Sequence, residues 1–290
     1  MNNYEKLEGM VAATFTPLDE NGDVNLSVID KYADWIASTP IKGVFVCGTT
    51  GEFSSLTIDE RKLILEKWLV SARKRFKVIA HVGSNCQRSA MELARHAAQV
   101  GADAIASIAP SFFKPGTVDE LVDFFAPICH SAAGLPFYYY NMPSITGVNL
   151  PVDKFLVEGK KKIPNLVGTK FTHNNLMEMG VCIELEQHRF EVLHGYDEIL
   201  ISGLAMGAVA GVGSTYNYIP NVYQAIFDSM KMNDLETARH NQIKSIRTVE
   251  VIIKYGGIDC GSCRLPIKPF SVDEYEKLRG DLDAIKFFEF

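Results

Sequence analysis

Two residues of this sequence, Lys170 and Tyr140, have side chains suited to covalent and proton-transfer chemistry. Each ends a short apolar run, residues 166–170 for the lysine and 136–140 for the tyrosine. An amine held where water is scarce favours its neutral form, which can attack a ketone to give an electron-withdrawing iminium. A phenol beside it can relay protons. A lysine that reaches solvent or pairs with a carboxylate is the alternative.

A glycine-flanked turn, Gly-Thr-Thr-Gly-Glu at residues 48–52, directly follows another apolar run at 43–47. Its backbone amides and the hydroxyls of Thr49 and Thr50 could cradle a small carboxylate. A plain tight turn in which Glu52 begins a helix or is a buried structural carboxylate is the alternative.

Paired carboxylates occur at Asp197 and Glu198, beside Gly195 and after an apolar run at residues 190–194. Such a pair can hold sugar hydroxyls, exchange protons or bind a metal ion. Metal binding is less well supported, because a hard cation gathers more oxygen ligands than one adjacent pair supplies. We therefore predict no metal site.

Ser214 follows the run at residues 208–212 in a Gly-Val-Gly-Ser segment that is similar to phosphate-binding loops of other barrels. No Gly-Lys-Ser or second amide-rich loop supports a phosphate site, so Ser214 is interpreted as a hydrogen-bond donor to substrate. Four further polar or aromatic residues are interpreted as core residues: His81, His194, Tyr138 and Tyr139.

Eight apolar runs alternate with segments that carry apolar residues at helical spacing, the order expected of repeated βα units. The runs are nearly continuous in apolar character, as in parallel strands buried on both faces. We predict a (β/α)8 barrel, which places catalytic residues at the carboxyl ends of its strands. The strand runs are 11–15, 43–47, 78–82, 104–108, 136–140, 166–170, 190–194 and 208–212, and the helical segments are 26–38, 58–75, 88–100, 117–132 and 175–186.

The chain continues well beyond the eighth run, and no low-complexity linker marks a domain boundary. We expect residues 1–217 to form the barrel and residues 218–290 a helical C-terminal extension of the same domain. One helix of this extension is predicted over residues 235–254.

Composition indicates an ordinary globular protein, with 47% hydrophobic residues and a net charge of −6. Nucleic-acid binding is disfavoured because no run of Lys and Arg forms a basic face. Neither a secretory leader nor an apolar stretch long enough for a membrane helix is visible, so a cytoplasmic location is expected. The six scattered cysteines read as reduced thiols, and Cys260 and Cys263 as part of a surface turn.

These motifs resemble those of the N-acetylneuraminate lyase and dihydrodipicolinate synthase superfamily, and the likeness runs from residue 11 through at least residue 217. The order and spacing of the signatures match the family. They are Gly-Thr-Thr-Gly-Glu at 48–52, Tyr-Asn-Met-Pro at 140–143 and Gly-Thr-Lys-Phe at 168–171.

The resemblance implies that Lys170 is the Schiff-base lysine and Tyr140 the proton-relaying phenol. Thr49 and Thr50 would hold the carboxylate of a pyruvate-type substrate. No metal or dissociable cofactor is implied, since the lysine iminium is itself the electron sink.

Two departures separate this chain from synthases that condense pyruvate with aspartate semialdehyde. Those enzymes carry an arginine shortly after the Tyr-Asn-x-Pro motif, where this chain has Ile145, and a tyrosine after the fourth strand, where it has Phe112 and Phe113. Other positions resemble the sialic acid lyase branch, which implies contacts to a polyhydroxylated sugar acid. They are Thr172, Gly195, Asp197, Glu198 and Ser214.

The implied activity is retro-aldol cleavage of N-acetylneuraminate to N-acetylmannosamine and pyruvate by a homotetramer. Another pyruvate-dependent aldolase, such as one acting on 2-keto-3-deoxy sugar acids, is the nearest alternative. A catalytically silent barrel that senses sugar acids is an alternative of a different class. The presence of Lys170, Tyr140 and Thr49 weighs against the sensor.

Overall fold

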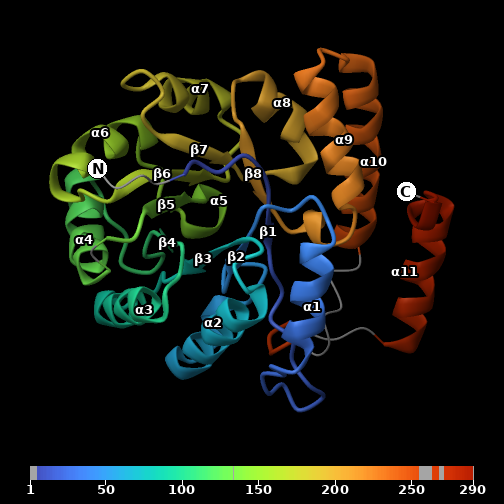
Figure 1. Cartoon of the computed structure of the whole chain (residues 1–290), viewed down its shortest axis with the longest axis horizontal. Helices are drawn as coiled ribbons and strands as arrows, with labels where there is room; N and C mark the ends of the chain where they lie inside the picture. Colours follow the sequence, from blue (N-terminus) through green and yellow to red (C-terminus); the bar gives the residue numbers. More distant parts are fainter. Residues whose placement is uncertain (1–4, 133, 255–262, 268–270, 290) are drawn as a thin grey trace.

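Eight parallel strands pair in sequence order, and β8 pairs with β1, so the sheet closes into a barrel (Figure 1). The computed structural model describes residues 5–132, 134–254, 263–267 and 271–289. The predicted (β/α)8 barrel is confirmed. Its strands are β1 (Gly9–Ala13), β2 (Gly43–Val46), β3 (Lys77–His81), β4 (Ala104–Ile108), β5 (Phe137–Asn141), β6 (Leu166–Phe171), β7 (Glu191–His194) and β8 (Ala210–Gly213).

The strands follow the predicted apolar runs closely. β4 has the predicted bounds, whereas β1 begins two residues before the predicted start at Val11. Almost every strand residue is buried, because the barrel interior covers one face of the sheet and the surrounding helices cover the other.

Helices surround the barrel (Figure 1). The helix predicted over residues 58–75 ends earlier, at Ala72, because Arg73 and Lys74 adopt left-handed backbone with φ of 48° and 59°. The helices are α1 (Val28–Ala37), α2 (Ile58–Ala72), α3 (Gln87–Val100), α4 (Val118–Ser131), α5 (Pro143–Thr146), α6 (Val152–Lys162), α7 (Leu176–Glu184), α8 (Leu200–Ala205), α9 (Pro220–Lys231), α10 (Leu235–Lys254) and α11 (Val272–Ala284), with short 3₁₀ turns η1 (Phe53–Ser55), η2 (Asp197–Ile199), η3 (Thr215–Asn217) and η4 (Phe287–Glu289).

The apolar core has two layers, one inside the barrel and one between the strands and the helices. Tyr139 points outward and packs against Phe125 and Phe155, whereas Tyr138 points inward. The Tyr138 hydroxyl donates to Glu191 Oε2 at 2.7 Å, and Glu191 Oε1 accepts from the backbone N–H of Leu7 at 2.6 Å. The prediction that both tyrosines pack in the core is confirmed.

The C-terminal part of the chain is helical, as expected, and α10 has the predicted bounds. α9 and α10 pack together beside the barrel, and α11 contacts α10 (Figure 1). The division at residue 217 stays a prediction. The turn predicted around Cys260 lies outside the described residues, apart from Cys263. Among the described residues, no helix is both long and apolar enough to cross a membrane.

Gly168 lies where β6 pairs with Glu191 of β7, and a Cβ at this position would overlap the Glu191 carbonyl oxygen. We expect Gly168→Ala to lower the free energy of unfolding by roughly 1–3 kcal/mol or more, because a paired strand backbone cannot easily move away. Denaturant unfolding measures the change. Gly280→Ala in α11 is the control, since nothing lies within 4 Å of its new Cβ and a small gain is expected. Equal stabilities of the two variants would contradict the clash.

Candidate active site

Lys170 lies on β6 inside the barrel and is only 4% exposed. Its Nζ lies 4.3 Å from the ring centroid of Phe45 and 4.1 Å from that of Tyr140. Within the described part of the chain, Nζ makes no hydrogen bond or ion pair. The alternative of a lysine paired with a carboxylate or reaching solvent is therefore wrong, and the amine has no hydrogen-bond or ion-pair partner among the described residues. Phe45 is not among the residues predicted for the site, although the period-2 alternation of side chains along β2 would have indicated that it points inward.

Tyr140 connects Lys170 to the glycine-flanked turn. Tyr140 and Lys170 are register partners on β5 and β6, so the phenol and the amine share the same level of the barrel. The Tyr140 hydroxyl lies 3.2 Å from Thr49 Oγ1 and donates to Met142 Sδ at 3.1 Å. The structure thus brings together three residues that the sequence placed at one site, and Thr50 lies half-buried in the same turn.

The turn itself is held in a tight conformation. Glu52 adopts left-handed backbone with φ of 53°, and its N–H donates to the Thr49 carbonyl at 3.0 Å. Thr16, which follows β1, donates its hydroxyl to the Gly51 carbonyl at 2.8 Å. A Cβ on Gly48 would lie 2.8 Å from the Phe45 ring, so only glycine fits beneath the turn. Thr49 is an exposed residue of this turn, and its hydroxyl lies beside that of Tyr140.

Thr172 and Gly195 lie side by side where β6 and β7 end. The Gly195 N–H donates to the Phe171 carbonyl at 2.9 Å, and a Cβ on Gly195 would overlap Thr172 Oγ1. Among the described residues, this buried hydroxyl has no hydrogen-bond partner. Glycine at 195 therefore leaves room for a hydroxyl group that can serve a ligand.

The two neighbouring carboxylates occupy different environments. Asp197 is buried, and its Oδ2 accepts from Thr215 N–H at 2.9 Å and Thr215 Oγ1 at 2.6 Å. Its Oδ1 has no partner among the described residues. Glu198 is half-buried and makes no hydrogen bond or ion pair with a described residue. No three His, Cys, Asp or Glu side chains of the described residues gather to hold a metal ion.

Burial raises the pKa of Asp197 to about 6, while the hydrogen bonds from Thr215 oppose this rise. The charge of Lys170 lowers the pKa of Asp197 by a smaller effect, so the two halves of the site interact electrostatically. Such a carboxyl group, buried at the mouth of a barrel, is a common feature of functional sites.

A series of hydrogen-bonded hydroxyls connects Asp197 to helices α9 and α10. Thr215 Oγ1 lies 2.5 Å from the Tyr223 hydroxyl, which lies 2.6 Å from Ser245 Oγ. Gln242 donates its side-chain N–H to the Asp197 backbone carbonyl at 3.0 Å. Sequence analysis missed these residues of α9 and α10, because no local pattern links helices beyond the barrel to a strand end.

Ser214 directly follows β8 and is half-buried beside Thr215. Its carbonyl accepts from Asn217 Nδ2 at 2.7 Å, and the same amide donates to the Ala13 carbonyl at 2.7 Å, which fixes the loop against β1. The predicted residues from β2, β5, β6, β7 and β8 thus all lie at one end of the barrel.

The two strand histidines are buried in the core, as predicted, but neither ring nitrogen of His194 has a hydrogen-bond partner among the described residues. His81 Nδ1 lies 2.7 Å from the Cys47 carbonyl, and its Nε2 accepts from the Ile108 N–H at 3.3 Å. Burial lowers the pKa of His81 well below its usual range and that of His194 to about 4. Both rings are therefore neutral at physiological pH.

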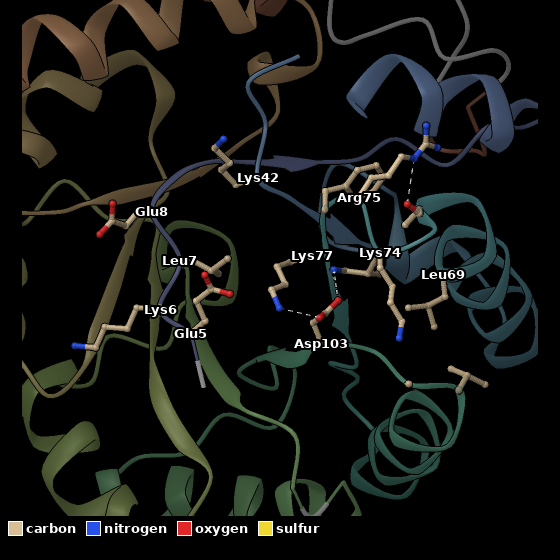
Figure 2. A pocket seen from close by; sticks show the side chains of 15 residues that line it. Glu5, Lys6, Leu7, Glu8, Lys42, Leu69, Lys74, Arg75, Lys77 and Asp103 are labelled. Atoms are coloured by element: carbon tan, nitrogen blue, oxygen red, sulfur yellow. Dashed lines mark hydrogen bonds and ion pairs between the residues drawn. The ribbon is translucent and has the colours of Figure 1, made fainter. Parts of the chain in front are cut away.

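A hollow of about 1160 Å³ opens at the opposite end of the barrel (Figure 2). Lys42 and Lys77, which line it, lie at the amino ends of β2 and β3. Because chemistry in this fold takes place at the carboxyl ends of the strands, this hollow is not the candidate site.

Comparison with known proteins shows the family to which the chain belongs. The model of the dihydrodipicolinate synthetase family matches residues 6–285. The chain belongs to this family. Membership of the family confirms the resemblance that the motifs predicted.

Individual relatives of the family share almost the whole chain. The N-acetylneuraminate lyase of Mus musculus is 39% identical over 300 residues, which cover 98% of this chain and 94% of that protein. The N-acetylneuraminate lyase of Gallus gallus is 40% identical over 302 residues, 98% of either chain. The solved structure of Proteus mirabilis N-acetylneuraminate lyase has a TM-score of 0.94 at 34% identity, covering 98% of this chain and 100% of that one.

The raised pKa of Asp197 predicts a pH dependence of stability. The pKa is about 6 in the folded protein against an ordinary value of 3.8, so the folded state holds the proton more tightly. This contribution to stability is fully present below about pH 4 and is lost as the pH rises through about 6, on the order of 1–3 kcal/mol. Denaturant unfolding between pH 4 and 7 should show the loss in the unaltered protein. Asp197→Asn should reduce it, and identical pH profiles would contradict the assignment.

Proposed function

We propose that this protein is a class I aldolase that cleaves N-acetylneuraminate to N-acetylmannosamine and pyruvate through a Schiff base on Lys170. The observation that carries this proposal is the uncommitted amine of Lys170, buried against the rings of Phe45 and Tyr140 at the catalytic end of the barrel. The relatives named N-acetylneuraminate lyase support the choice of substrate.

The covalent step uses the neutral amine as a nucleophile. Lys170 Nζ adds to the C2 ketone of the open-chain sugar acid, and loss of water gives an iminium. A base then takes the proton of the C4 hydroxyl, the C3–C4 bond breaks, and its electron pair moves onto the iminium as an enamine. N-acetylmannosamine leaves, and protonation and hydrolysis of the enamine release pyruvate and free the lysine.

Tyr140 is the proposed proton relay of this reaction. Its ring is 2% exposed and contacts Nζ, and its hydroxyl reaches Thr49 rather than the protein interior. A phenol in this position could accept the proton that the C4 hydroxyl loses and return it to C3 of the enamine. The substrate carboxylate would then lie against Thr49 and Thr50, whose turn presents hydroxyls next to the amine.

The remaining residues of the site would hold the hydroxylated part of the sugar acid. Unfilled hydrogen-bonding capacity at Thr172 and at Asp197 Oδ1 supports this role, because a buried polar atom without a partner is costly until a ligand supplies one. Glu198 and Ser214 are half-buried residues of the same end of the barrel. Gly195 has no Cβ, so the Thr172 hydroxyl can lie against it. Several neutral and acidic partners suit a polyol better than a second carboxylate.

The residues that stand in place of the synthase arginine and tyrosine are exposed. Ile145, which replaces the synthase arginine, is 63% exposed, and Phe112 and Phe113 are 77% and 87% exposed. We also propose a homotetramer in the cytoplasm, which rests on the family resemblance and on the sequence. No dissociable cofactor is needed for the proposed reaction, because the iminium accepts the electron pair.

Replacing the nucleophile tests the covalent step. We expect Lys170→Ala to abolish cleavage of N-acetylneuraminate and the trapping of pyruvate by borohydride, because no other amine of the described residues lies over the rings of Phe45 and Tyr140. Mass spectrometry detects the reduced pyruvate adduct, and circular dichroism checks that the variant is folded. Near-normal turnover would reject Lys170 as the nucleophile. So would a variant that still gains the mass of the reduced pyruvate adduct.

Replacing Glu198 tests the choice of substrate. Glu198→Ala should lower kcat/KM for N-acetylneuraminate by roughly tenfold or more, because a hydroxyl loses a charged acceptor. Pyruvate lacks that hydroxyl and should still be trapped on Lys170 to the extent seen in the unaltered protein. Glu236→Ala, at an exposed glutamate of α10, is the control and should change neither measurement. Equal loss of cleavage and trapping would mean that Glu198 supports the lysine rather than the sugar.

A further inference from the structure

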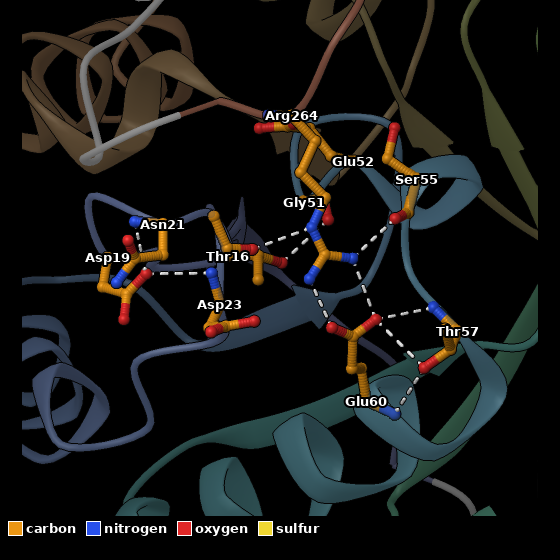
Figure 3. A network of polar contacts seen from close by, with 11 residues as sticks. Thr16, Asp19, Asn21, Asp23, Gly51, Glu52, Ser55, Thr57, Glu60 and Arg264 are labelled. Atoms are coloured by element: carbon orange, nitrogen blue, oxygen red, sulfur yellow. Dashed lines mark hydrogen bonds and ion pairs between the residues drawn. The ribbon is translucent and has the colours of Figure 1, made fainter.

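Arg264 lies far along the sequence from the barrel strands, after α10, yet its side chain contacts the loops at the catalytic end (Figure 3). Its Nε donates to the Gly22 carbonyl at 2.9 Å, and its Nη1 donates to the Ser55 carbonyl at 2.7 Å. Nη1 also donates to Glu60 Oε2 at 2.9 Å, and Nη2 donates to Glu60 Oε1. One guanidinium therefore joins the loop after β1, the 3₁₀ turn η1 and helix α2.

The pairing between Arg264 and Glu60 is fixed in geometry. Glu60 belongs to the capping box of α2, where its carboxylate accepts from Thr57 N–H at 2.7 Å and Thr57 Oγ1 at 3.0 Å. The side chains of Arg264 and Glu60 are 22% and 23% exposed, so water competes less than at an open surface. Arg264 holds the pKa of Glu60 at about 2, and the carboxylate stays ionised at physiological pH. A two-pronged arginine–carboxylate contact is stronger and more directional than a single hydrogen bond.

The same arginine reaches the glycine-flanked turn at residues 48–52. Its backbone N–H donates to Glu52 Oε2 at 3.3 Å. Glu52 is the residue of that turn with left-handed backbone, a conformation that a non-glycine residue keeps only when its surroundings hold it there. Thr16 holds the turn through the Gly51 carbonyl, so Arg264 and Thr16 are contacts of the same turn from different parts of the chain.

We propose that Arg264 is a positioning residue that fixes the turn at residues 48–52 for binding of the substrate carboxylate. This inference rests on the proposed function, in which Thr49 and Thr50 hold that carboxylate. Arg264 then acts on the binding turn from outside it and touches neither the substrate nor Lys170. Without its guanidinium, Ser55, Glu60 and the loop at Gly22 lose their common donor, and the turn samples conformations that bind pyruvate poorly.

The test measures the pyruvate concentration that gives half-maximal borohydride trapping on Lys170. In Arg264→Gln this concentration should rise by about tenfold, which corresponds to the loss of one good charged contact, while the maximal extent of trapping stays unchanged. Arg264→Lys keeps the positive charge but loses the two-pronged contact with Glu60, so the half-maximal pyruvate concentration should rise less. For N-acetylneuraminate, KM should rise more than kcat falls.

Arg75 provides a matched control at the opposite end of the barrel (Figure 2). It too donates to backbone carbonyls, those of Ser71 at 2.9 Å and Ala72 at 3.2 Å, and pairs with Asp34 at 2.8 Å. Arg75→Gln therefore removes a similar set of contacts and should leave the half-maximal concentration unchanged. Thermal unfolding shows whether the variants are folded. If Arg264→Gln is unfolded, Arg264→Lys is the variant that tests the proposal.

The outcomes separate this inference from the proposed function. If the unaltered protein is not trapped by pyruvate, the proposed function fails, and the inference fails with it. If the unaltered protein is trapped but the Arg264 variants saturate at the same pyruvate concentration, this inference alone is overturned. An equal shift in Arg75→Gln would also overturn it, because the effect would then follow from a general loss of stability.

Discussion

The site depends on one constraint, an amine that must be kept inside a closed barrel without a carboxylate to neutralise it. Burial of an unpaired ammonium is costly, and the rings of Phe45 and Tyr140 supply polarisable surfaces close to Nζ. Barrel closure makes this arrangement possible, because it brings β2 across from β6 while β5 and β6 stay in register. A carboxylate beside Nζ would satisfy the charge and remove the nucleophile.

Much of this arrangement could be predicted from the sequence, for physical reasons. Strands buried on both faces give continuous apolar runs, and the carboxyl-end rule then selects Lys170, Tyr140 and Thr49. The sequence could not predict that Phe45 lies under the amine, because side-chain distances across a barrel depend on strand tilt and register. It could not distinguish Asp197 from Glu198 either. The 3₁₀ turn η2 directs the Asp197 carboxylate to Thr215 and leaves that of Glu198 without a partner among the described residues.

The two halves of the site rely on different parts of the fold. Strand register positions the amine and the phenol, whereas Asp197 relies on hydroxyls that extend from Thr215 through Tyr223 of α9 to Ser245 of α10. In the proposed reaction, the covalent chemistry would therefore depend on the paired strands. The proposed contacts to the sugar would depend in addition on helices outside the barrel, and one barrel fold can carry different sites in this way.

The hydrogen bonds of Glu191 to Tyr138 and to Leu7 have a consequence for the movement of molecules through the barrel. Both bonds lie at the amino-terminal end of the barrel, and apolar side chains pack inside the barrel. In the proposed reaction, substrate and water would then enter at the carboxyl end. In the proposed reaction, the aldehyde product lies between the enamine and that entrance, so it blocks the hydrolytic water until it departs. The order of product release would follow from the shape of the barrel, without any moving lid.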